Sequence, residues 1–168
     1  WSELGGAALG TYGTGYISSI ITDTAGNVYA AGAFEDVNYN FYVAKWDKAT
    51  GKWGALGYIE LEANDAIKSL TMDKYGNIYA GGYFSYGTNT NNTYIAKWDK
   101  ATDAWSTLGE EAVPKGAGGD AINALAADPD GNIYAAGEFV NNNYNVYVAQ
   151  YGSGSGLSIP VSGSVSGS

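Results

Sequence analysis

The 168-residue sequence contains neither cysteine nor histidine. It can form no disulfide, and it has no thiol nucleophile, no imidazole base and no zinc site of the usual nitrogen and sulfur kind. Arginine is also missing, so the 8 basic residues are all lysines, against 17 acidic residues and a net charge of −9. This balance excludes the basic stripe of a nucleic-acid binder and disfavours binding to anionic membranes.

Long apolar runs and proline are scarce. No apolar run approaches the ~18 residues of a transmembrane helix, so we expect no membrane insertion. Glycine (25 residues) and tyrosine (15) are abundant, and 45% of the chain is apolar. This composition favours a folded, turn-rich β protein. An acidic chain rich in Tyr, Asn, Gly and Ser, beginning at Trp1, is typical of a processed microbial export. We therefore expect an extracellular or cell-surface location.

One sequence pattern occurs three times along the chain. TDTAGNVYAAGAF at 22–34 recurs as MDKYGNIYAGGYF at 72–84 and as ADPDGNIYAAGEF at 127–139. Each copy follows an apolar alternation and precedes a second apolar run. The pattern predicts one domain followed by a Gly/Ser-rich tail or linker. The predicted ranges are 1–151 for the domain, 1–52, 53–104 and 105–151 for its repeat units, and 152–168 for the tail.

Within a repeat the apolar period is two, which is typical of β-strands. The D-x-x-G-N segments between strands favour hairpin turns, since Asp accepts backbone hydrogen bonds and Gly supplies a positive φ. Four strands per ~50 residues is the spacing of a propeller blade. We predict an all-β, β-propeller-like fold of three four-stranded antiparallel blades. The strands predicted for the first blade are Tyr16–Thr22, Asn27–Phe34, Phe41–Asp47 and Trp53–Leu56.

These motifs resemble known propeller repeats. D-x-x-G-N-[VI]-Y-A-x-G-x-F resembles the bacterial β-propeller repeats of the SBBP and delta-60 type. Y-[VI]-A-K-W-D and W-x-x-L-G are similar to kelch-like repeats of secreted proteins. The resemblance covers Trp1 to about Tyr151 in three copies. It implies the fold and a cell-surface or secreted setting, but no particular function, because propellers carry many.

The ends of the repeat array predict self-association. W-S-E-L-G at residues 1–5 matches the fourth strand of a repeat, whereas the third repeat has Gly and Ser where that strand would follow. Propellers usually have 4 to 8 blades. Three arrangements are open: a partial ring of a larger protein, two copies paired into a six-bladed ring, or a threefold prism. An unpaired edge invites association in each case.

The tail offers a second strand candidate. It is either a flexible linker or a donated strand, because its apolar residues alternate with period two. The candidate assembly residues are Trp1, Leu157, Ile159 and Val161.

The loops between the second and third strands combine one tyrosine with several asparagines. A tyrosine ring can stack on a sugar, and asparagine amides can bond its hydroxyls, so a glycan is a candidate partner. The alternative is a polar surface loop closed by its tyrosine. The candidate ligand-binding residues are Tyr39, Asn40, Tyr86, Asn91, Asn92, Tyr144 and Asn145.

Metal binding and catalysis are disfavoured. The oxygen-rich turn at 128–132 lacks the bidentate Glu of a calcium loop, which favours a plain hairpin. The carboxylate pairs Glu60 with Glu62 and Glu110 with Glu111 are adjacent in sequence rather than set across a cleft. We expect no cofactor, metal or catalytic residue. The sequence favours a non-catalytic extracellular structural or adhesive module that self-associates, with a lectin-like, carbohydrate-binding propeller as the alternative.

Overall fold

The computed structural model describes residues 1–6, 9, 15–58, 61–84, 95–108, 121–140 and 148–152. In these ranges the secondary structure consists of strands, turns and bends, which confirms the all-β prediction. No helix in the described ranges could cross a lipid bilayer. The strands are β1 (Ile17–Thr22), β2 (Val28–Gly32), β3 (Ala44–Asp47), β4 (Lys52–Ala55), β5 (Ile67–Met72), β6 (Ile78–Gly82), β7 (Ile95–Asp99), β8 (Ala104–Thr107), β9 (Ile122–Ala127), β10 (Ile133–Gly137) and β11 (Ala149–Tyr151).

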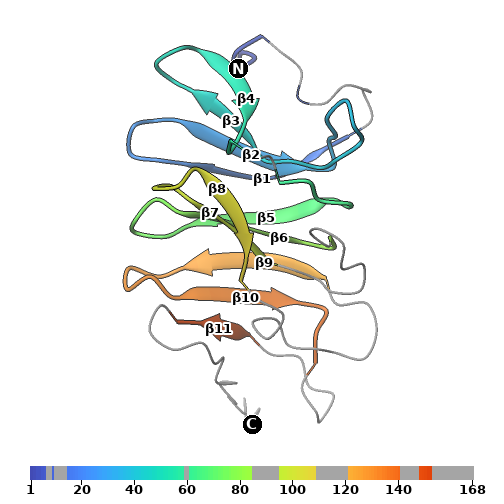
Figure 1. Cartoon of the computed structure of the whole chain (residues 1–168), viewed down its shortest axis with the longest axis vertical. Coiled ribbons are helices and arrows are strands. Elements are labelled where there is room, and N and C mark those ends of the chain that lie inside the picture. The colour runs from blue at the N-terminus through green and yellow to red at the C-terminus, as the bar shows by residue number, and fades with distance from the viewer. Residues whose placement is uncertain are drawn as a thin grey trace.

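The strands form three antiparallel sheets, one for each sequence repeat (Figure 1). Sheet 1 has the order β1-β2-β3-β4, and sheet 2 has the order β5-β6-β7-β8. Sheet 3 contains β9, β10 and β11, so its described part has three strands rather than the predicted four. The registers repeat as well, since Trp46 lies opposite Trp53 in sheet 1 and Trp98 opposite Trp105 in sheet 2.

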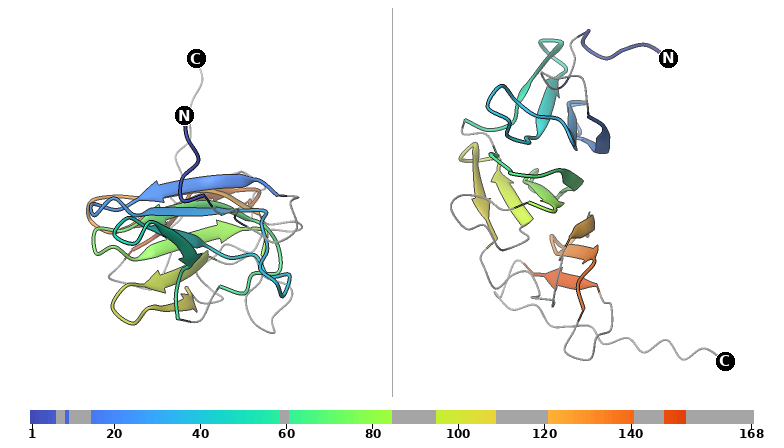
Figure 2. Two further views of the ribbon diagram at one scale, coloured as in Figure 1. Left: turned by 90° about the horizontal axis from the view of Figure 1, so that it is seen from above. Right: turned by 90° about the vertical axis from the view of Figure 1, so that its right-hand side faces the viewer.

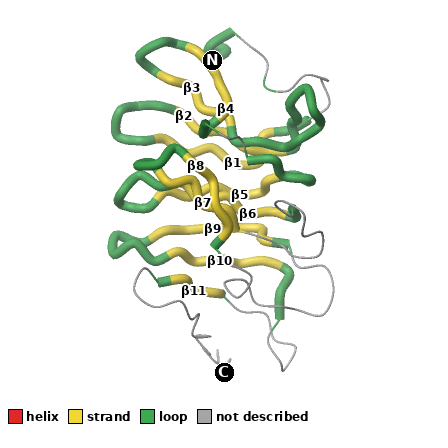
Figure 3. Tube along the Cα trace, in the orientation of Figure 1, coloured by secondary structure: helices red, strands yellow, loops and turns green. Residues whose placement is uncertain are grey.

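The sheets follow one another in an open arc, with the first strand of each packed against the next (β1 on β5, β5 on β9). Figure 2 shows sheets 1 and 3 at opposite ends of this arc, with sheet 2 between them. Turns and loops gather at the two ends of the strands (Figure 3). The chain is therefore seen in an open arrangement and not as the closed prism that was one of the three alternatives.

The core lies between the sheets. Tyr29, Val43 and Leu56, in or next to sheet 1, form one buried cluster with Ile67 and Leu70 of sheet 2. Trp98 and Trp105, on the two outer strands of sheet 2, join this cluster. A second buried cluster joins the second and third repeats. It contains Tyr79, Ile95, Ile122, Ile133, Ala135, Phe139 and Ala149.

The glycine that ends the second strand of each repeat is required by close packing. A Cβ at Gly32 would collide with the carbonyl oxygen of Tyr16 at the start of the neighbouring strand. Gly82 and Gly137 meet the carbonyls of Ala66 and Ala121 in the same way. The glycine that recurs in A-x-G-x-F is therefore a steric requirement of the sheet.

Candidate assembly interface

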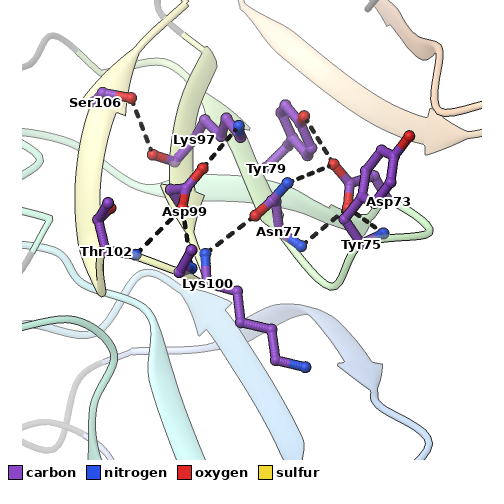
Figure 4. A network of polar contacts seen from close by, with 10 residues as sticks. Asp73, Tyr75, Asn77, Tyr79, Lys97, Asp99, Lys100, Thr102 and Ser106 are labelled. Carbon is purple, nitrogen blue, oxygen red and sulfur yellow. Dashed lines mark hydrogen bonds and ion pairs between the residues drawn. The ribbon is translucent and has the colours of Figure 1, made fainter.

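The most regular polar feature is the hairpin turn of the D-x-x-G-N-x-Y motif (Figure 4). The Asp73 carboxylate accepts hydrogen bonds from the backbone N–H and side-chain amide of Asn77, at 3.0 and 2.9 Å, and from the Tyr79 hydroxyl at 3.1 Å. Gly76 supplies the positive φ of +84°. Equivalent bonds surround Asp23 and Asp128. The carboxylates are thus engaged within their own hairpins, as a plain turn predicts.

Asparagine links this hairpin to the next one. The Asn77 side-chain oxygen accepts the backbone N–H of Lys100 at 3.0 Å, so the turn after β5 is joined to the turn after β7 (Figure 4). Asn27 accepts from Lys48 in the same manner in sheet 1. The motif residues therefore hold the four strands of one sheet together at one end.

The hydrogen bonds and burial of the hairpin motif shift the pKa values of its Asp and Tyr side chains. Burial raises the pKa of the Tyr29 phenol to about 12, and its hydrogen bond to Asp23 acts in the same direction. Burial acts to raise the pKa of Asp23 itself, but the hydrogen bonds from Asn27 and Tyr29 outweigh it and leave that pKa below its ordinary value. The Asn132 side chain lowers the pKa of Asp128 to about 2. At neutral pH these groups are fixed carboxylates and neutral phenols, which suits a structural role.

A tryptophan hydrogen bond connects successive repeats. The Trp105 indole N–H donates to the carbonyl of Leu56, the residue after β4, at 2.8 Å. The Trp53 indole N–H donates to the carbonyl of Leu4 at 2.9 Å. Each acceptor is followed by a glycine of positive φ, +100° at Gly57 and +79° at Gly5. Residues 4–5 therefore contact sheet 1 in the same way as residues 56–57 contact sheet 2.

Serines add polar links between the first strands. The Ser18 hydroxyl donates to the Ile67 carbonyl at 2.6 Å, and the Ser19 hydroxyl accepts the Leu70 N–H at 3.0 Å. Ser69 accepts the Leu125 N–H at 2.9 Å at the following junction. Position 124, the equivalent in the third repeat, is alanine. The junctions between sheets are thus specific combinations of apolar packing and hydrogen bonds.

Sheet 1 exposes an apolar face that the other sheets bury. Ile17 and Ile20 on β1 are 54% and 65% exposed. Their equivalents on β5, Ile67 and Leu70, are 0% and 4% exposed because the preceding sheet covers them. The face of sheet 1 that points away from sheet 2 is therefore one half of an inter-sheet junction.

Sheet 3 exposes a different position of the repeat. Val148, just before β11, is 51% exposed, whereas its equivalents Val43 and Ile95 are 1% and 4% exposed. The following sheet covers those two residues. The two ends of the arc thus expose different positions of the repeat. Sequence reasoning did not single out Ile17, Ile20 or Val148; the available signal was their place in the outermost repeats.

Few of the residues expected in a site lie in the described ranges. Trp1 is fully exposed, and Tyr39 is exposed at a positive φ of +66°. The Asn40 N–H donates to the Asp36 carboxylate at 2.9 Å and closes that loop as a turn. The expected glycan and tail residues outside the described ranges are Tyr86, Asn91, Asn92, Tyr144, Asn145, Leu157, Ile159 and Val161.

Carboxylates do not gather into a site within the described ranges. No group of three or more His, Cys, Asp or Glu side chains there could hold a metal ion. Of the four glutamates considered as acid–base pairs, only Glu62 is described, and it is exposed.

Comparison with known proteins supports the fold. No family model and no curated protein sequence matches the chain. Among solved structures, it is similar to the GH74 xyloglucanase from Xanthomonas campestris, with a TM-score of 0.59 and 15% identity over 86% of this chain and 21% of that chain. It is also similar to a gluconolactonase from Xanthomonas campestris, with a TM-score of 0.54 and 13% identity over 93% of this chain and 52% of that chain.

Both of these proteins are β-propellers, so the sheets of this chain are arranged as propeller blades. The chain corresponds to only part of either protein's length. At such low identity the similarity concerns the fold alone, and the enzymatic activities named for these two proteins do not transfer to this chain.

Proposed function

We propose that this chain is a non-catalytic structural or adhesive propeller module, extracellular or at the cell surface, that works by associating with itself. The observation that carries the proposal is the pair of uncovered end surfaces. Ile17 at one end and Val148 at the other occupy positions that are buried at both internal junctions. The position of Ile20 is buried at the first junction (Leu70) and partly buried at the second (Leu125). Burying one such side chain stabilises a contact by about 1.5–3 kcal/mol, so leaving both ends in water is costly.

The remaining polar chemistry fits this role. Asp23, Asp73 and Asp128 are each held by Asn and Tyr within a hairpin, so these carboxylates are already engaged inside the fold. Because the similar structures are propeller enzymes, an enzymatic function is the competing proposal. Only the similarity of fold supports it. The lectin-like alternative rests on loops of which only the first is described.

Self-association is tested at the exposed face of β1. Ile20→Asp places a charge at the centre of the proposed contact, so we expect it to abolish assembly, since a charge cannot be buried there without a partner. Val37→Asp is the matched control, because Val37 is equally exposed (68%, against 65% for Ile20) but lies in the loop after β2. Size-exclusion chromatography with light scattering measures the mass of each. A wild-type chain that is monomeric at every concentration contradicts the proposal.

A further inference from the structure

Among the described strands, the outermost strand of sheet 3 has a neighbour on one side only. β3 pairs with β2 and β4, and β7 pairs with β6 and β8. β11, the equivalent strand of sheet 3, pairs with β10 alone among the described strands. Its outer edge therefore presents backbone groups that are hydrogen-bonded at the equivalent position in the other two sheets, and such an edge is a template for a further strand.

Residues 1–5 have the sequence of the missing strand. W-S-E-L-G at 1–5 corresponds to W-G-A-L-G at 53–57 and W-S-T-L-G at 105–109, which overlap β4 and β8. The end of the segment already has the local geometry of those strands, because Leu4 accepts the Trp53 indole as Leu56 accepts Trp105. Trp1 to Glu3 are exposed and form no strand within their own chain.

We propose that the segment Trp1–Leu4 of one copy adds to β11 of a second copy as the fourth strand of its sheet 3. The partner is thus another molecule of this chain, and the inference rests on the proposed self-association. The register follows from the repeats: Trp46 opposite Trp53 and Trp98 opposite Trp105 place Trp1 opposite Tyr151. Ser2 then lies opposite Gln150, and Leu4 opposite Val148.

This register satisfies groups at both ends of the arc. The Leu56 N–H donates to the Val43 carbonyl at 2.8 Å, so the Leu4 N–H would donate to Val148. The Trp1 indole would reach the carbonyl of Leu108, as Trp105 reaches that of Leu56. Leu4, 41% exposed, and Val148 would be covered together, as Leu56 and Val43 are.

A second copy fits this role better than the chain's own N-terminus. The segment lies beyond sheet 1, whereas β11 lies at the other end of the arc with sheet 2 between them (Figures 1 and 2). Two copies joined head to tail supply each end to the other. Their six sheets fall within the range of 4 to 8 blades in which propellers close.

Engineered disulfides test the register, and the absence of native cysteine leaves no competing thiol. Residues directly opposite in an antiparallel pair have Cα atoms about 4.5–5.5 Å apart, within reach of a disulfide. A chain carrying only Ser2→Cys is mixed with a chain carrying only Gln150→Cys and oxidised. Because the two cysteines are on different chains, only contact between copies can join them. We expect a covalent dimer in the mixture and little in either variant alone.

The matched control replaces Ser2→Cys by Glu3→Cys, which shifts the cysteine by one residue and turns it to the other face of the strand. We expect its crosslinking with Gln150→Cys to fall at least tenfold. Equal crosslinking in both mixtures, or none in either, overturns the strand addition. If the wild-type chain remains a dimer by light scattering in that event, self-association stands and only its route is wrong; a monomer overturns both.

Discussion

At the scale of single residues, the two complete sheets differ at the indole of their third strand. The Trp98 N–H donates to the carboxylate of Asp103 at 3.0 Å. The equivalent Trp46 N–H is buried and finds no hydrogen-bond partner in the described part of the chain. The cause is the residue at the hairpin, where sheet 1 has Gly51 in place of Asp103. Both residues have a left-handed backbone, with φ of +67° and +53°.

Gly51→Asp should therefore stabilise sheet 1. A hydrogen bond to a charged group contributes about 1.5–3 kcal/mol, and left-handed strain costs a non-glycine residue about 1 kcal/mol. The side chain has room, because a Cβ at Gly51 meets no atom within 4 Å. We therefore expect the balance of the two effects to raise the free energy of unfolding in urea by about 1 kcal/mol. Gly51→Ala is the control: it adds the strain without the acceptor and should lower the free energy of unfolding. An Asp variant no more stable than the Ala variant would refute this account.

The residue scale also marks where sequence reasoning succeeds. The roles of Asp73, Gly76 and Asn77 in the turn follow from the motif, because all their partners lie within a few residues. The unsatisfied Trp46 could not be predicted from its own strand. It depends on Gly51 across a hairpin, and its counterpart Trp98 has the same local sequence with a different outcome.

At the scale of elements, the hairpins should respond to alkaline pH. The pKa of Tyr29 is raised to about 12 from 10.0, so the folded state holds its proton more tightly than the unfolded chain. Its contribution to stability is complete below pH 10 and is lost as the pH rises from about 10 to about 12. We expect the free energy of unfolding of Tyr29→Phe to fall less steeply with pH over this interval than that of the wild type. Parallel curves would show that Tyr29 does not titrate in this way.

Strand positions were predictable because the period of two and the turn motif are local signals. Tyr16–Thr22 was expected and β1 is Ile17–Thr22; Trp53–Leu56 was expected and β4 is Lys52–Ala55. The exception is Phe41, expected to begin the third strand. It pairs with Ala63 in the segment between sheets, with bonds of 2.9 and 3.1 Å, and β3 begins only at Ala44. A pairing partner 22 residues away cannot be predicted from the alternation of apolar residues around Phe41.

At the scale of the whole molecule, identical repeats become unequal through their place in the arc. Ile17 and Ile67 occupy one position of the motif, yet one is half exposed and the other fully buried. The alternation of residues along a strand does not predict this difference in exposure. The difference depends on whether another sheet packs against that strand. The sequence predicts self-association from an unpaired edge but does not say which residues take part. The exposed residues at each end could be identified only once the packing of the sheets was known.

Two segments are candidates for the outer edge of β11, and we expect only a change in the N-terminal one to weaken dimerisation. The tail offers only the alternation of Leu157, Ile159 and Val161, whereas residues 1–5 offer the W-x-x-L-G pattern and a hydrogen bond already made at Leu4. We expect the chain lacking residues 153–168 to keep the mass of a dimer in light scattering. Trp1→Ala leaves Leu4 in place but removes the indole that would reach Leu108, and it should weaken dimerisation at least tenfold. The reverse result, a monomer after tail removal and an unchanged dimer in Trp1→Ala, would assign the edge to the tail.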